Sequence, residues 1–251
     1  MTKLSQLILH SFFLGVCAVL LGALVDHYWN TTLFILLSTT LGYIYLRRNH
    51  LSVDQRKGAL YATVILSIPT AISFYFLPTQ AKAVAVFSAA LTLLYAQENN
   101  FSLRKYVIVK PLAIAMCWTL NTIVISYEDP LFFIPNDHSV LIHVIHIFLL
   151  TFVLSLLYDL RDFKNGMDDT IVFFNYFGEK NTKLIIVTIL NLSLVLSILF
   201  SSLLSASVAL FGASLYTIAL LYWGKPNKEL VYTWLVDSAF IIYAVLAMVV
   251  Y

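Results

Sequence analysis

The sequence predicts an all-α integral membrane protein, built as a bundle of about nine transmembrane helices. Its residues are 61% hydrophobic and only 11% charged, whereas roughly a quarter of the residues in an ordinary soluble domain are charged. The apolar residues also form long uninterrupted blocks. A helix needs about 20 such residues to cross a bilayer, and the strands of a membrane barrel are far shorter. A soluble fold and a strand-based membrane fold are therefore both excluded.

The apolar blocks define the expected spans in order along the chain. They are Leu4–Val25, Thr31–Leu46, Gly58–Leu77, Ala81–Gln97, Tyr106–Ser126, Ser139–Tyr158, Leu184–Leu203, Ser205–Trp223 and Leu230–Tyr251. The first block lacks a small-residue cleavage site before the next span, so it is interpreted as a retained helix. The seventh and eighth spans run together, and one straight helix over both would measure roughly 60 Å, about twice the bilayer core. The chain is therefore expected to turn back near Ser201–Ser205.

The basic residues predict the orientation of the bundle. Positive charge near the ends of spans is retained on the cytoplasmic side of a membrane. With these spans, fourteen of the fifteen Lys and Arg residues fall on one side, and Lys82 falls on the other. We therefore expect a cytoplasmic N-terminus, a C-terminus on the opposite side, and a multi-pass protein of a bacterial inner membrane.

No low-complexity tract or strong repeat divides the chain, so one transmembrane helical domain is expected over residues 1–251. Cys17 and Cys117 both lie in apolar blocks, which argues against a disulfide framework and against a cysteine metal site. The net charge of +2 is too small to indicate a nucleic-acid partner. Membrane lipid is the expected partner.

An acidic cluster at the end of the sixth span is the most informative segment. Four carboxylates fall within eleven residues, those of Asp159, Asp162, Asp168 and Asp169. Asp159 and Asp162 are three residues apart, so they project from one face of a helix. Two anions at a helix C-terminus are unfavourable, because the backbone carbonyls there already present negative potential. A compensating cation is expected, either from Arg161 or Lys164 or from a bound Mg²⁺.

The same segment continues into the longest polar connection, Leu160–Lys183. It contains the aromatic run Phe173-Phe174-Asn175-Tyr176-Phe177. This run is interpreted either as a short cap along the membrane surface over a cavity or as an anchor of the loop at the interface. The residues alone do not separate the two.

The pattern Asp159-x-x-Asp162 … Gly166-Met167-Asp168-Asp169-Thr170 resembles the UbiA-type intramembrane prenyltransferase superfamily, as do the basic residues that enter the fifth span. The resemblance implies that carboxylates hold Mg²⁺ against the pyrophosphate of a polyprenyl donor, whose ionisation leaves a carbocation for an acceptor to attack. Carried over, it implies metal ligands at Asp159, Asp162, Asp168 and Asp169. It implies pyrophosphate-binding residues at Lys110, Arg104, Lys105 and Lys164. Such basic groups are needed because a highly charged leaving group requires cationic partners.

The chain departs from the family after the second span. The family has a first Asp-rich motif there, but residues 41–50 contain no carboxylate, and none follows until Asp54. Arg47 and Arg48 stand in its place, either as phosphate ligands or as anchors on the cytoplasmic side. Two hypotheses follow: a divergent Mg²⁺-dependent prenyltransferase, or a non-catalytic UbiA-like subunit that binds a lipid or a membrane protein partner. The sequence leaves open whether the protein is an enzyme.

Two further groups of polar residues lie in apolar spans. Asp237 falls about 10 Å into the ninth span, where an ionisable side chain usually faces the protein interior. It is interpreted as a cavity carboxylate or as a hydrogen-bond partner of Tyr or Asn on a neighbouring helix. His143 and His146 share a face of the sixth span, close to His138. They are interpreted either as half of a metal site or as histidines that lie at the membrane interface without a metal.

Overall fold

The computed structural model describes residues 2–24, 29–48, 51–97, 103–127, 138–165, 173–200, 204–226 and 229–250. Its ten α-helices are α1 (Lys3–Gly22), α2 (Trp29–Arg47), α3 (Val53–Tyr75), α4 (Thr79–Ala96), α5 (Val109–Thr119), α6 (His138–Lys164), α7 (Phe173–Phe177), α8 (Glu179–Phe200), α9 (Leu204–Trp223) and α10 (Glu229–Val249). A 3₁₀ turn, η2 (Leu103–Lys105), precedes α5, and a π turn, η3 (Leu120–Val124), extends it. No strand occurs in these ranges, which confirms the all-α prediction.

Seven helices of the described chain are long and apolar enough to cross a membrane: α1, α3, α4, α6, α8, α9 and α10. The two other expected spans coincide with α2 and with the shorter apolar stretch Val109–Val124. The chain is therefore a multi-pass membrane protein. The count of nine spans, the orientation of the two termini and the single domain stay predictions.

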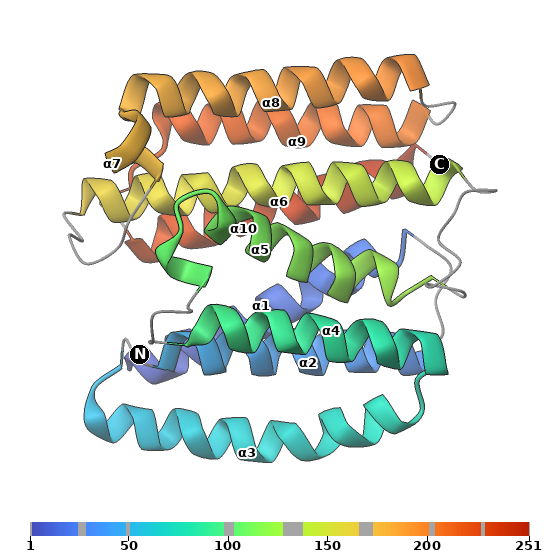
Figure 1. Cartoon of the computed structure of the whole chain (residues 1–251), viewed down its shortest axis with the longest axis vertical. Helices are drawn as coiled ribbons and strands as arrows, with labels where there is room; N and C mark the ends of the chain where they lie inside the picture. Colours follow the sequence, from blue (N-terminus) through green and yellow to red (C-terminus); the bar gives the residue numbers. More distant parts are fainter. Residues whose placement is uncertain are drawn as a thin grey trace. The chain divides into compact units, whose positions relative to one another are not determined.

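The helices form two compact units. The first contains residues 1–87 and 120–132, and the second contains residues 88–119 and 133–251. In the first unit α2 packs against both α1 and α3 (Figure 1). The backbones of α1 and α2 approach closely at Gly15, where an added Cβ would lie 2.6 Å from the Thr40 hydroxyl and 2.9 Å from the Leu36 carbonyl. A small residue at this position permits the tight helix contact that is typical of membrane bundles.

In the second unit α6 is the central helix. It contacts α5, α7, α8, α9 and α10, and it is the most deeply buried of the seven candidate spans. Figure 1 shows α8 and α9 side by side, and α9 in turn packs along α10. A helix that is enclosed by neighbours can carry charged side chains only if those neighbours supply partners. The C-terminal end of α6 meets this requirement.

Candidate functional site

The candidate site is a buried charged cluster at the C-terminal end of α6, defined by Lys110, Asp159, Arg161 and Asp162. The four residues are between 1% and 9% exposed. Burying a charge is costly unless the charge is paired and hydrogen-bonded. Two of these residues are positive and two are negative, so the charges compensate one another within the second unit.

Lys110 enters the cluster from the first turn of α5 and forms an ion pair with Asp159 Oδ1. The start of α5 suits this position, because Pro111 follows directly and proline is tolerated in the first turn of a helix. The second carboxylate oxygen, Oδ2, accepts a hydrogen bond of 3.0 Å from the backbone N–H of Phe173. Both oxygens of Asp159 therefore have partners from other helices.

Arg161 pairs with its neighbour Asp162. Its Nε and Nη2 atoms donate to Asp162 Oδ1 over 2.9 and 2.6 Å, and Nη1 donates to the Thr233 hydroxyl of α10 over 2.8 Å. The guanidinium group also lies over the ring of Tyr158 at 5.1 Å. The compensating cations at this end of the helix are thus Lys110 for Asp159 and Arg161 for Asp162.

The aromatic run of the connection forms α7 at this cluster. Phe173 and Phe174 are buried, whereas Tyr176 is exposed. Phe174 stacks on Phe163 of α6 with ring centroids 5.9 Å apart. The run therefore packs on α6 through Phe174, and the N–H group of Phe173 binds Asp159.

Asp237 lies beside the charged cluster. It is 3% exposed, and Oδ1 accepts a hydrogen bond from the Tyr158 hydroxyl. This bond joins α10 to α6, as the bond from Arg161 to Thr233 does one turn away. Asp237 thus has a tyrosine on a neighbouring helix as its hydrogen-bond partner, as one of the two interpretations expected. Its role as a cavity carboxylate stays a prediction.

The other predicted site residues lie elsewhere. Lys164 pairs with Glu179 over 2.5 Å, and Glu179 also pairs with Lys183 over 2.8 Å, on a partly exposed surface. Lys105 is exposed in η2. Arg104 is in the same turn, and its side chain lies outside the described part of the chain, as do Asp168 and Asp169 entirely. Their roles as phosphate and metal ligands stay predictions.

Sequence reasoning missed Thr233 and the Phe173 N–H group as members of the site. Thr233 carried a signal, because it precedes Asp237 by four residues and so lies on the same face of α10. The backbone donor of Phe173 carried none, since any residue can supply an N–H group. The position of this N–H group depends on how α7 packs against α6.

The histidines at the other end of α6 form a separate polar group. The Nδ1 atoms of His143 and His146 lie 2.8 and 3.1 Å from the hydroxyl of Tyr243 on α10. Both rings are buried. The side chain of His138 lies outside the described residues. The two described rings are thus joined to a tyrosine of the protein core.

Metal binding depends on the ligands that the described side chains can offer. They contain no group of three His, Cys, Asp or Glu residues that converges on one point. Asp159 and Asp162 contribute two carboxylates, and each has a cationic partner. Mg²⁺ usually binds through one or two carboxylates plus substrate phosphates and waters. The donor set therefore fits Mg²⁺ only if a phosphate ligand supplies further oxygens.

Comparison with known proteins identifies the fold. No family model and no curated protein sequence matches this chain. A solved structure of digeranylgeranylglyceryl phosphate synthase does match, with a TM-score of 0.60 over 98% of this chain and 96% of that one. The two sequences are 13% identical. That synthase is a UbiA-type prenyltransferase. The chain is thus a membrane protein with a UbiA-like fold, and at this identity the likeness extends to the fold alone.

Proposed function

We propose that this protein binds a polyprenyl lipid through its pyrophosphate headgroup at the buried charged cluster, in a cavity that opens toward the cytoplasm. The observation that carries the proposal is the pair of buried cations, Lys110 and Arg161, in a fold shared with a membrane prenyltransferase. Buried lysine and arginine are rare in apolar helices and usually mark a ligand path. The proposal places the protein in a bacterial inner membrane.

The two cations suit a pyrophosphate for different reasons. Arginine offers a planar fork of donors that matches phosphate oxygens, and lysine offers a compact charge. Pyrophosphate binding would exchange the bonds to Asp159 and Asp162 for bonds to phosphate oxygens. The two freed carboxylates would then hold Mg²⁺ together with the ligand, with Asp168 and Asp169 as further candidates. Bound there, Mg²⁺ would supply positive charge to the departing pyrophosphate.

In its catalytic form, the proposal is a divergent Mg²⁺-dependent prenyltransferase that acts on an aromatic or lipid acceptor. The test is binding of radiolabelled geranylgeranyl pyrophosphate to the full-length protein in nanodiscs, with Mg²⁺ or with EDTA. We expect Mg²⁺ to strengthen binding, and Asp159→Asn and Asp162→Asn each to weaken the Mg²⁺-dependent part. Asp54→Asn is the matched control, because Asp54 is an exposed carboxylate of the first unit.

The test separates a site from a structural motif. If both Asn variants bound the ligand with the same Mg²⁺ dependence as the wild type, the two carboxylates would be structural partners of the basic residues. If Asp54→Asn lost as much binding as the two variants in the cluster, the effect would reflect the net charge of the protein and not the site. Pyrophosphate release on addition of candidate acceptors then measures transfer.

A second candidate function is a non-catalytic UbiA-like subunit that binds a lipid or a membrane protein partner. Two observations favour it. Both oxygens of Asp159 already have protein partners, and residues 41–50 contain no carboxylate for a first metal-binding motif. This alternative predicts lipid binding that is indifferent to EDTA, no pyrophosphate release with any acceptor, and co-purification with a partner in fixed stoichiometry.

A further inference from the structure

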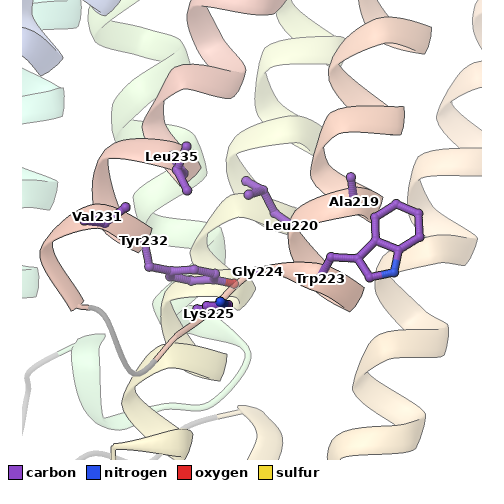
Figure 2. A pocket seen from close by; sticks show the side chains of 8 residues that line it. All are labelled: Ala219, Leu220, Trp223, Gly224, Lys225, Val231, Tyr232 and Leu235. Carbon is purple, nitrogen blue, oxygen red and sulfur yellow. The ribbon is translucent and has the colours of Figure 1, made fainter.

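A second feature of the second unit is a pocket of about 430 Å³ where α9 ends and α10 begins. Figure 2 shows its lining, which consists of Ala219, Leu220, Trp223, Gly224, Lys225, Val231, Tyr232 and Leu235. The volume falls within the range of about 300–1,000 Å³ that is typical of small-molecule sites. Most lining residues are apolar, so the walls suit the glycerol and acyl portion of a lipid.

The mouth of the pocket carries the features of a membrane interface. Trp223 is 80% exposed and Tyr222 beside it is 56% exposed. Aromatic side chains at helix ends are typical of the level of lipid headgroups. Lys225 is an exposed cation in the lining, and the ammonium group of Lys183 lies 5.6 Å from the ring of Tyr222. Positive charge therefore lies at the mouth of the pocket, next to its apolar walls.

Tyr232 contributes a polar group that the protein leaves unsatisfied. The residue is 1% exposed, and its hydroxyl has no hydrogen-bond partner among the described residues. Figure 2 shows the oxygen end of its ring directed toward Gly224 and Lys225. A buried hydroxyl without a partner costs about 1–3 kcal/mol. A ligand oxygen beside Lys225 would remove this cost.

Gly224 is required for this arrangement because both the backbone of α9 and the ring of Tyr232 pack directly against it. A Cβ at Gly224 would lie 2.3 Å from the Leu220 carbonyl oxygen and 2.7 Å from Tyr232 Cε2, which is too close for a side chain. The backbone N–H of Gly224 donates to the Leu220 carbonyl over 2.9 Å and closes α9. The ring and its hydroxyl are thus held in the pocket wall by backbone packing.

We infer that this pocket binds the phosphate headgroup of an anionic phospholipid from the surrounding bilayer. Lys225 would pair with the phosphate, the Tyr232 hydroxyl would donate to one of its oxygens, and the apolar wall would contact the acyl chains. Basic pockets between transmembrane helices are recognised binding sites for anionic lipid headgroups. The pocket adjoins the charged cluster, since Tyr232 is near enough to Arg161 to interact with its charge. The inference does not rest on the proposed polyprenyl site, because the lining shares no residue with the cluster.

Tryptophan quenching tests this inference with the full-length protein. Nanodiscs of phosphatidylcholine would contain a small fraction of either brominated phosphatidylglycerol or brominated phosphatidylcholine. The chain has four tryptophans, so the signal of Trp223 is taken as the difference between the wild type and Trp223→Phe. We expect phosphatidylglycerol to be enriched at Trp223 by about fivefold, the effect of one lysine near a membrane surface.

The variants assign the preference to the pocket. Lys225→Ala should abolish it, and Tyr232→Phe should reduce it while the ring packing is kept. Lys180→Ala is the matched control, because Lys180 is an exposed lysine of α8 outside the lining. Equal quenching by both lipids would overturn the inference. An equal loss in Lys180→Ala would do the same, as would loss of the preference on adding inorganic phosphate, which would indicate a free anion as the occupant.

Discussion

The ends of α2 and α6 carry charge in two different ways. At the end of α2, within the first unit, the guanidinium group of Arg47 lies 5.6 Å from the ring of Tyr43. That of Arg48, the residue after α2, lies 3.9 Å from the ring of Tyr45. Both tyrosines belong to α2. Both arginines are half-buried. At the end of α6, within the second unit, the charges are buried and bound by residues of α5, α7 and α10.

This difference distinguishes a contact made within one helix from a cluster that several helices hold together. A cation over a ring of its own helix adds about 0.5–1 kcal/mol at an exposed position, and it needs no other helix. A buried pair is tolerated only where its remaining donors and acceptors also find partners, and here those partners come from α5, α7 and α10. The resemblance of the sequence to the UbiA-type superfamily implies an Asp-rich motif at both positions, and this chain has carboxylates at one of them.

We expect the ends of α2 and α6 both to face the cytoplasm. A topology reporter tests this orientation, because its activity is either present or absent. A phosphatase that is active only outside the cytoplasm, fused after Tyr251, should be active. The same fusion in the loop near Arg56 should be inactive, because fourteen of the fifteen basic residues are expected on the cytoplasmic side. An inactive C-terminal fusion would mean that the spans have been miscounted.

Removing one partner of the buried ion pair should have the largest effect on stability. Lys110→Met leaves Asp159 buried without its cation, which costs roughly 3–5 kcal/mol. Thermal unfolding in detergent should show a clearly lower midpoint. The double variant Lys110→Met/Asp159→Asn should recover a substantial part of the loss, because it removes the unpaired charge. A single variant as stable as the wild type would contradict the buried pair.

A smaller loss is expected from the hydrogen bond that joins α6 to α10. Tyr158→Phe removes the donor to Asp237 and keeps the ring, at a cost of about 1–3 kcal/mol. The same unfolding measurement checks this, with Tyr176→Phe as the control, because Tyr176 is exposed. Equal behaviour of the two variants would show that the bond between Tyr158 and Asp237 contributes nothing to stability.

The smallest effect is expected at the end of α2. Arg48→Ala should cost about 1 kcal/mol, because it removes the contact of the guanidinium group with the ring of Tyr45. It should leave the binding of geranylgeranyl pyrophosphate close to that of the wild type, because Arg48 lies outside the buried charged cluster. A loss of binding as large as that of Asp159→Asn would assign Arg48 to the phosphate site and remove the contrast between the two helix ends.

Much of the molecule was predictable because the signals are local. Long apolar blocks indicate membrane helices wherever they occur, and the break between α8 and α9 follows from bilayer thickness. The candidate carboxylates at the end of α6 were visible from their spacing, and so was the shared face of Asp159 and Asp162. A resemblance based on those few residues also pointed to the fold that the structural comparison supports.

The pairing of the charges was decided by tertiary structure. The nearest basic neighbours of Asp159 along the chain are Arg161 and Lys164, but its cation is Lys110, 49 residues earlier. Lys164 binds Glu179 instead. Asp237 meets Tyr158 across 79 residues. Sequence spacing reveals which side chains share a helix face, whereas helix packing decides which faces meet, and in a low-dielectric interior that meeting determines where a charge can be buried.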